Sequence, residues 1–120
     1  MQLLMQRIIM ETNYEFIHSV AMWEDYTAIT IVALDKNSSC RIQIYNDNPQ
    51  EAIVSDLYVA HIERRKGVAT KVLDYCIRLA KSFNCTSLSL RSDANDWVRA
   101  WYRRSGFEEV SSHVWLSKKI

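Results

Sequence analysis

The apolar residues of this chain change their spacing once near its centre, and that change restricts the folds it can adopt. Before residue 60 they form β-branched or alternating runs at Tyr26–Asp35, Cys40–Asn46 and Glu51–Ala60, separated by the polar turns KNSS and DNPQ. Runs of this kind predict strands joined by hairpins. Over Val68–Phe83 the spacing becomes helical, with a wide apolar face opposite charged side chains. We therefore expect a three-stranded meander followed by a long amphipathic helix.

The rest of the chain repeats the change from strand to helix. The segment Thr86–Ser92 alternates serine with leucine and predicts a strand. Asp93 is a suitable N-cap and Gly106 a suitable C-terminal stop for a helix between them. Two short strands are expected near residues 107–110 and 113–117. Residues 1–25 have mixed character, and we predict a first strand with a short helix there.

Length and composition predict a single soluble domain. The 120 residues, 48% hydrophobic and 24% charged, suffice for one core, so we expect residues 1–120 to form one domain. Cys40, Cys76 and Cys85 lack CxxC spacing, and we interpret them as buried apolar residues rather than metal ligands. No run of about 18 apolar residues marks a membrane span. A cytoplasmic protein without a metal is therefore expected.

Charge is distributed unevenly along the chain, although the net charge is only +1. Residues 1–60 carry 3 Lys and Arg against 8 Asp and Glu, a balance of −5. Residues 61–120 carry 12 against 6, a balance of +6. Such asymmetry suggests that an anionic partner docks on the C-terminal half.

The segment HIERRKGVAT, residues 61–70, joins the third predicted strand to the predicted helix. Three consecutive cations, Arg64, Arg65 and Lys66, precede Gly67, one of 2 glycines in the chain. The first amides of a helix have no acceptor within it, and the helix dipole favours an anion there. Glycine lets the backbone approach a ligand closely, and arginine binds phosphate oxygens with two hydrogen bonds. These residue types together predict a pyrophosphate site.

The segment lacks the GxxxxGK[ST] and GxGxxG patterns of nucleotide-binding loops. Its run Arg64-Arg65-Lys66-Gly67-Val68-Ala69 resembles instead motif A of the GNAT superfamily of acyl-CoA-dependent N-acetyltransferases, [Q/R]-x-x-G-x-[G/A]. The stretch NDWVRAWYRRSGF, residues 95–107, is similar to motif B of that family, N-x(6)-Y-x(3)-G-F. The resemblance covers Glu51–Ile120, and two motifs in order make it specific.

Three features depart from the family pattern. His61 stands where the family often has proline, and Ala69 replaces the second glycine of motif A. The chain is also short before Tyr26, where the family places two helices that wall the acceptor pocket. The resemblance therefore leaves the acceptor open, whether a small-molecule or a peptide amine.

The resemblance implies a fold and a ligand. The fold is α/β (α+β), a mixed, mostly antiparallel sheet with helices on both faces and a shortened N-terminal helical region. Acetyl-CoA, the implied cosubstrate, would lie between strands that splay apart at Ile53–Val59 and Ser87–Arg91. The implied binding residues, for the pantetheine arm and then for the pyrophosphate and the site around it, are Leu57, Tyr58, Val59, Arg64, Arg65, Lys66, Gly67, Val68, Ala69, Thr70, Asn95 and Tyr102.

The implied reaction is direct attack of a primary amine on the thioester. Tyr102 occupies the family's general-acid position and would protonate the departing thiolate, while a strand amide near Val59 would hold the oxyanion. For the base, Glu51 and Asp56 are candidates, with water or an already neutral amine as alternatives. Glu51 and Ser55 share one parity of their strand, whereas Asp56 has the opposite parity.

Other interpretations remain open at this point. Tyr102 also fits a packing role, beside the helical stripe of Trp97 and Trp101. The domain could bind acyl-CoA without turning it over, or it could be a nucleic-acid-binding α/β domain that uses residues 64–66 and the arginines of the second helix. Near-neutral net charge disfavours the latter, so we expect no nucleic-acid or membrane partner. A homodimer is possible.

Overall fold

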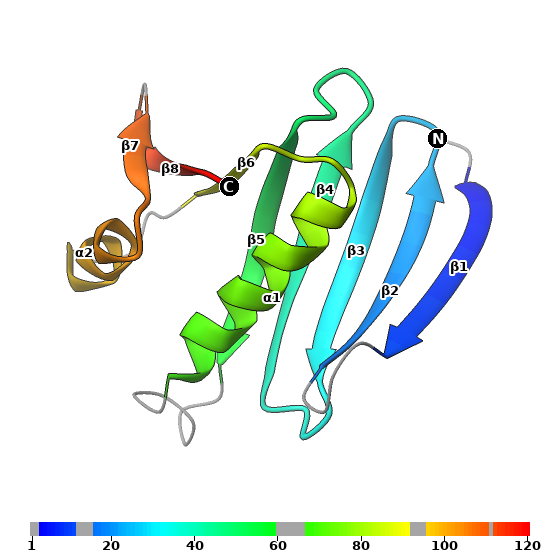
Figure 1. Ribbon diagram of the computed structural model, residues 1–120, viewed down its shortest axis with the longest axis horizontal. Coiled ribbons are helices and arrows are strands. Elements are labelled where there is room, and N and C mark those ends of the chain that lie inside the picture. Colours follow the sequence, from blue (N-terminus) through cyan, green and yellow to red (C-terminus); the bar gives the residue numbers. More distant parts are fainter. Residues whose placement is uncertain (1–2, 12–15, 60–66, 92–95, 111) are drawn as a thin grey trace.

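The structure is a computed structural model that describes residues 3–11, 16–59, 67–91, 96–110 and 112–120 (Figure 1). In chain order its elements are β1 (Leu3–Glu11), β2 (Phe16–Trp23), β3 (Tyr26–Ala33), β4 (Ser38–Tyr45), β5 (Glu51–Val59), α1 (Val68–Ser82), β6 (Ser87–Arg91), α2 (Asp96–Arg104), β7 (Glu108–Val110) and β8 (Ser112–Lys119). The strands form one eight-stranded sheet in the order β1-β2-β3-β4-β5-β6-β8-β7. Only β5 and β6 pair in parallel within it. The predicted mixed, mostly antiparallel sheet is confirmed.

The helix α1 lies diagonally across the sheet in Figure 1 and forms the centre of the core. Its inward residues are Val72, Leu73, Tyr75, Cys76, Leu79 and Ala80. They pack against Ile29, Ile31 and Ile42, which are fully buried on β3 and β4. The predicted start of this helix at Val68 and its amphipathic pattern are both confirmed.

Both described helices lie on one face of the sheet. Leu90 and Leu116 pair across β6 and β8 within the core under α1, and Glu109 of β7 pairs with Leu116 and contacts α2. The expectation of helices on both faces is therefore wrong for the described part of the chain. Because the crossovers β5-α1-β6 and β6-α2-β7 are expected to be right-handed and both advance toward the same edge, they place both helices on one side.

We call the opposite side the helix-free face, since none of the described helices covers it. Side chains alternate along each strand, so every second residue of β2 to β8 belongs to this face. Its described members include Trp23, Tyr26, Thr30, Val32, Arg41, Gln43, Tyr45, Glu51, Ile53, Ser55, Ser89 and Ser117.

The N-terminal region differs from the prediction. Residues 3–11 and 16–23 form two strands, so the short helix expected within residues 1–25 is wrong for the described residues. Only Glu24 and Asp25 separate β2 from β3, which leaves no room for a helix there. On β2 the inward positions are Phe16, His18 and Val20. Because the polar His18 occupies an inward position, the alternation of apolar and polar side chains along β2 is not recognisable in the sequence.

The three cysteines are buried thiols, as predicted. Cys40 of β4 and Cys76 of α1 face each other with their Sγ atoms 3.1 Å apart. The hydrogen bond to Cys40 and burial both raise the pKa of the Cys76 thiol well above its usual range. These side chains therefore pack as apolar residues.

His18 is the buried titratable group between sheet and helix. Only 2% of its surface is exposed, and its Nδ1 lies 2.7 Å from the Tyr75 hydroxyl of α1. The imidazole is uncharged when its Nδ1 accepts a hydrogen bond from the phenol O–H of Tyr75. Burial lowers the pKa of His18.

None of the helices in the described ranges is long and apolar enough to cross a membrane.

We predict that His18 makes the fold sensitive to acid. Its folded-state pKa lies below the ordinary value of about 6.5, so between these two values the unfolded chain binds more protons than the folded one. Its contribution to the free energy of unfolding is complete above about pH 6.5 and is lost as the pH falls toward the folded-state pKa. Urea unfolding at about pH 7.5 and about pH 5.5 measures this loss. Between these two pH values, the free energy of unfolding should fall less for His18→Gln than for the parent protein. An equal fall would contradict the prediction.

Candidate active site

The parallel pairing of β5 with β6 covers only the first part of β5. Residues Glu51–Val54 of β5 pair with Ser87–Leu90 of β6, and the described pairs end there. β5 continues to Val59, with its other edge paired to β4 through Ser38↔Val59, whereas β6 is described only as far as Arg91. From Ser55 to Tyr58, no described strand pairs with this edge of β5, which is where an extended ligand can add to the sheet.

A bulge in β5 lies at the point of separation. Between the pairs Ser39↔Tyr58 and Arg41↔Ser55, β4 advances two residues and β5 three. The extra residue is in the region of Asp56, which has a left-handed φ of 55°. The bulge changes which residues of β5 face the core, because Leu57 packs against it after Val54.

The bulge explains where Asp56 lies. Simple alternation would place this carboxylate inward with Ala52 and Val54, but its side chain is 69% exposed. It lies 3.7 Å from the guanidinium of Arg41, a residue of the helix-free face. Asp56 therefore presents its carboxylate toward that face at the place where β5 leaves β6.

The start of α1 has the features predicted for an anion site. Gly67 precedes the helix with φ 76° and has no side chain that could cap it, and no acidic residue lies in the first turn. A Cβ placed on Gly67 would have no atom within 4 Å, so the space beside it is open. Val68 and Ala69 are half-buried and Thr70 is exposed. The amides at the start of a helix can donate hydrogen bonds to an anionic ligand.

Several predicted binding residues lie outside the described part of the chain. These are Arg64, Arg65, Lys66 and Asn95, together with the predicted N-cap Asp93. Of the predicted pantetheine-binding strand, Leu57 and Val59 are half-buried and Tyr58 is 53% exposed.

Tyr102 of α2 lies inside the core, with 8% of its surface exposed. Its ring makes edge contacts with Trp101 and Phe107. Burial, followed by the neighbouring Cys40 and Cys76, raises the pKa of its phenol. The hydroxyl therefore keeps its proton at neutral pH and can donate it. Both predicted roles, packing and proton donation, are compatible with this position.

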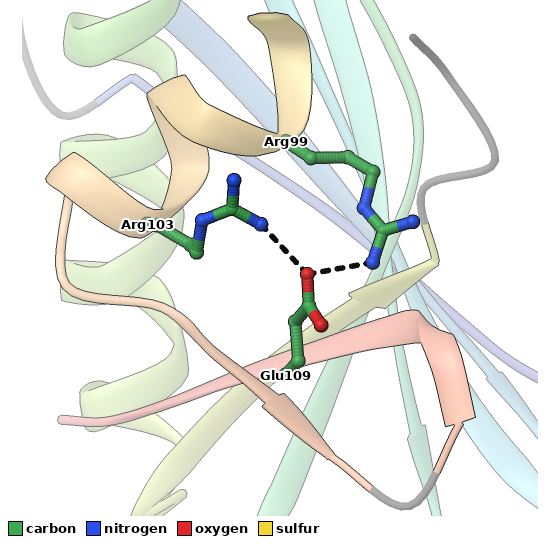
Figure 2. Close-up of polar contacts among 3 residues, drawn as sticks. All are labelled: Arg99, Arg103 and Glu109. Atoms are coloured by element: carbon green, nitrogen blue, oxygen red, sulfur yellow. Dashed lines mark hydrogen bonds and ion pairs between the residues drawn. The ribbon is translucent and has the colours of Figure 1, made fainter. Parts of the chain in front are cut away.

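A pair of ionic contacts fixes α2 to the sheet (Figure 2). One carboxylate oxygen of Glu109 on β7 accepts hydrogen bonds from Arg99 and Arg103, each 2.7 Å long. Arg99 is largely covered, with 13% of its side chain exposed. Since Tyr102 lies on the same helix, these contacts also hold its backbone in place. Nothing in the sequence identified Glu109 as the partner of these two arginines.

Glu51 lies away from the point where the strands separate. It pairs with Ser87 at the far end of the parallel ladder. Its carboxylate accepts a hydrogen bond of 2.8 Å from Ser89, whose Oγ is 3.0 Å from that of Ser117. The alternation of serine and leucine predicted a serine face on β6, but Ser89 was not singled out because its partners come from other strands.

No three His, Cys, Asp or Glu side chains gather as a possible metal site in the parts of the chain that the structure describes.

Comparison with known proteins supports an acetyltransferase at the level of sequence. Residues 7–107 match the acetyltransferase (GNAT) family. The chain is 32% identical over 103 residues to the aminoglycoside N(6')-acetyltransferase type 1 of Acinetobacter haemolyticus, across 82% of this chain and 67% of that protein.

Solved structures resemble the fold. The ribosomal-protein-S18-alanine N-acetyltransferase from Escherichia coli has a TM-score of 0.64 at 18% identity, over 82% of this chain and 72% of that one. The PaiA N-acetyltransferase from Thermoplasma acidophilum, in complex with coenzyme A, has a TM-score of 0.63 at 18% identity, over 80% of this chain and 62% of that one. At such identities the likeness concerns the fold alone.

We predict that Gly67→Ala destabilises the protein by about 1–2 kcal/mol, the cost of a left-handed backbone for alanine. No clash adds to it, because the space beside Gly67 is open. Gly67→Asn should cost less, since asparagine tolerates this conformation. Gly106→Ala should cost more than Gly67→Ala, because its Cβ would lie 3.1 Å from Cε of Lys118. Urea unfolding compares the three variants, and equal losses for Ala and Asn at Gly67 would oppose this account.

Proposed function

Because the chain belongs to the GNAT acetyltransferase family, we propose that it transfers an acetyl group from acetyl-CoA to a primary amine, by direct attack in a ternary complex. The observation that carries this proposal is the end of the described β5–β6 pairing at Val54, followed on the next element by a helix start at Gly67, which has no capping side chain of its own. An extended thioester arm and a pyrophosphate require these two features, and here they occur on consecutive elements of the chain.

The proposed binding mode uses mostly backbone groups. The arm of acetyl-CoA pairs with the edge of β5 near Leu57 and Tyr58 and continues the sheet. The amides of residues 67–70 bind the pyrophosphate, with Arg64, Arg65 and Lys66 supplying positive charge. The open space beside Gly67 supports this assignment.

The proposed chemistry takes place between the edge of β5 and α2. The amine nitrogen attacks the thioester carbon, a strand amide near Val59 holds the oxyanion, and the bond from carbon to sulfur breaks as the intermediate collapses. Tyr102 gives its proton to the thiolate of coenzyme A and is reprotonated from solvent. Its raised pKa keeps that proton available at neutral pH.

Asp56 is the stronger of the two base candidates. A protonated primary amine such as lysine titrates near 10.4, so a proton must leave it before attack. Asp56 lies just beyond the last described β5–β6 pair and faces solvent, whereas Glu51 lies five residues earlier and is hydrogen-bonded to Ser89. We propose that the carboxylate of Asp56 binds the ammonium group of the acceptor. The proton of that ammonium then passes to solvent through a water molecule.

The acceptor is proposed to be a small cationic amine. The relative from Acinetobacter haemolyticus is named for acetylation of aminoglycosides, and this chain is 32% identical to it. Aminoglycosides are therefore the first compounds to test, followed by polyamines and peptide N-termini.

The first test measures binding and turnover separately. Coenzyme A should raise the melting temperature, because a ligand that binds only the folded state stabilises it. With acetyl-CoA and an amine panel, free thiol should appear only when an acceptor is present. A rise in melting temperature without thiol release on any acceptor would favour a non-catalytic acyl-CoA-binding module. No rise and no release would oppose the proposal entirely.

The second test concerns Tyr102. If its hydroxyl protonates the thiolate, Tyr102→Phe should lower kcat about a hundredfold while KM for acetyl-CoA changes little. Trp101→Phe, at the neighbouring position of the same helix, serves as the control for altered packing and should keep most of the activity. An unchanged kcat in Tyr102→Phe would leave this residue with a packing role alone.

A further inference from the structure

We infer that the helix-free face carries a second cation subsite, which holds an ammonium group of a polycationic acceptor about 13 Å from the amine that is acetylated. The subsite consists of the aromatic row Trp23, Tyr26 and Tyr45 together with Glu51. The inference rests on the proposed function and deepens it, because it makes amines with at least two positive charges the preferred acceptors.

The aromatic row crosses three neighbouring strands. The ring centroids of Trp23 and Tyr26 are 6.2 Å apart and their planes differ by 15°. Those of Tyr26 and Tyr45 are 5.3 Å apart and their planes differ by 35°. All three side chains are half-buried, and none of the described helices covers them. The row therefore offers partly accessible aromatic surface, which attracts cations.

Glu51 continues the row on β5. Gln43 pairs with Ile53, so by register Tyr45 and Glu51 are neighbours on the same face. A turn closes this end, with the amide of Asn48 bonded to the carbonyl of Tyr45 and the amide of Glu51 to that of Asn48. The hydrogen bond from Ser89 fixes the carboxylate of Glu51, which has further lone pairs for an ammonium.

The charges around the row favour a cation over an anion. Three further carboxylates lie in the turns at this end of the sheet, on Glu24, Asp25 and Asp47. Lys119 carries the opposite charge, but it pairs with Ser87 on the far side of β6. The acidic balance of the N-terminal half is thus concentrated near the aromatic row, as complementarity to a polycation requires.

The distance between the two sites follows from strand geometry. Four residues separate Glu51 from Ser55, where β5 leaves β6, and a strand rises about 3.3 Å per residue. An acceptor with one amine at the separation would reach the subsite with a second ammonium about 13 Å away. Linear polyamines and aminoglycosides are acceptors of this chemical class.

The experiment compares diamines with monoamines in the thiol-release assay. The probes are α,ω-diamines of increasing length and the monoamine matched to each. For the parent protein, kcat/KM should be highest for the diamine whose amines span about 13 Å and should exceed that of its monoamine about tenfold. Tyr45→Leu removes the ring and should raise KM for that diamine about tenfold. The kcat for the diamine and the kcat/KM for the monoamine should stay unchanged. Tyr45→Phe keeps the ring and should behave as the parent protein.

Two further variants keep the test decisive. Val32→Ala changes an exposed apolar residue at the far end of the same face. It should leave kcat/KM unchanged for diamines and for monoamines. If Tyr45→Leu does not fold, Tyr26→Leu replaces it, since Tyr26 is the neighbouring ring of the row and has no part in the proposed chemistry. It should raise KM for the diamine alone.

The outcomes separate the subsite from the proposed function. Equal kcat/KM for diamines and monoamines, or an unchanged KM for the diamine in Tyr45→Leu and in Tyr26→Leu, would overturn the subsite and leave acetyl transfer intact. A loss of kcat with the monoamine in Tyr26→Leu would also overturn it, because the row would then act on acetyl transfer itself. Absence of thiol release with every amine would overturn both.

Discussion

The parallel pairing of β5 with β6 is the constraint from which the site follows. Parallel neighbours cannot be joined by a tight turn, so the chain must cross the sheet between them, and here α1 forms the crossover. The amino end of that helix then lies toward the carboxyl end of β5, where the ladder has already ended at Val54. The part of β5 beyond its described pairs with β6 and the first turn of α1 therefore lie toward the same edge of the sheet because of topology.

The covering of the sheet on one side decides how two substrates can meet. Both described helices pack on one face, so acetyl-CoA would be held between β5 and the helices while an acceptor approaches from the helix-free face. The bulge in β5 connects these two sides, because it brings Asp56 outward beside Arg41. The aromatic row lies on that same open face. Because only two residues join β2 to β3, no helix stands between these strands to cover the row.

Much of the fold could be predicted because local rules and tertiary packing agree. The strands β3 and β4 and the helix α1 each follow one periodic pattern of apolar residues. Turn residues, such as Gly106 after α2, mark where the elements end. The prediction failed where a single polar residue interrupts the pattern, as His18 does on β2, where it is compensated by Tyr75 from a helix 57 positions away. For the candidate site, Gly67 and Tyr102 could be identified by motif spacing. The geometry of Asp56 could not, because no glycine marks the bulge in β5.

The sequence by itself determined the order of strands and helices, the glycine before α1 and the family, because these depend on residues close together in the chain. Tertiary structure alone decided which face the helices cover, where β5 leaves β6, and which partners Glu51, Tyr45 and Glu109 meet. The physical reason is that pairing register and crossover handedness are properties of the assembled sheet. Contacts between residues distant in the chain form only once that sheet exists, so the pattern along one strand cannot specify them.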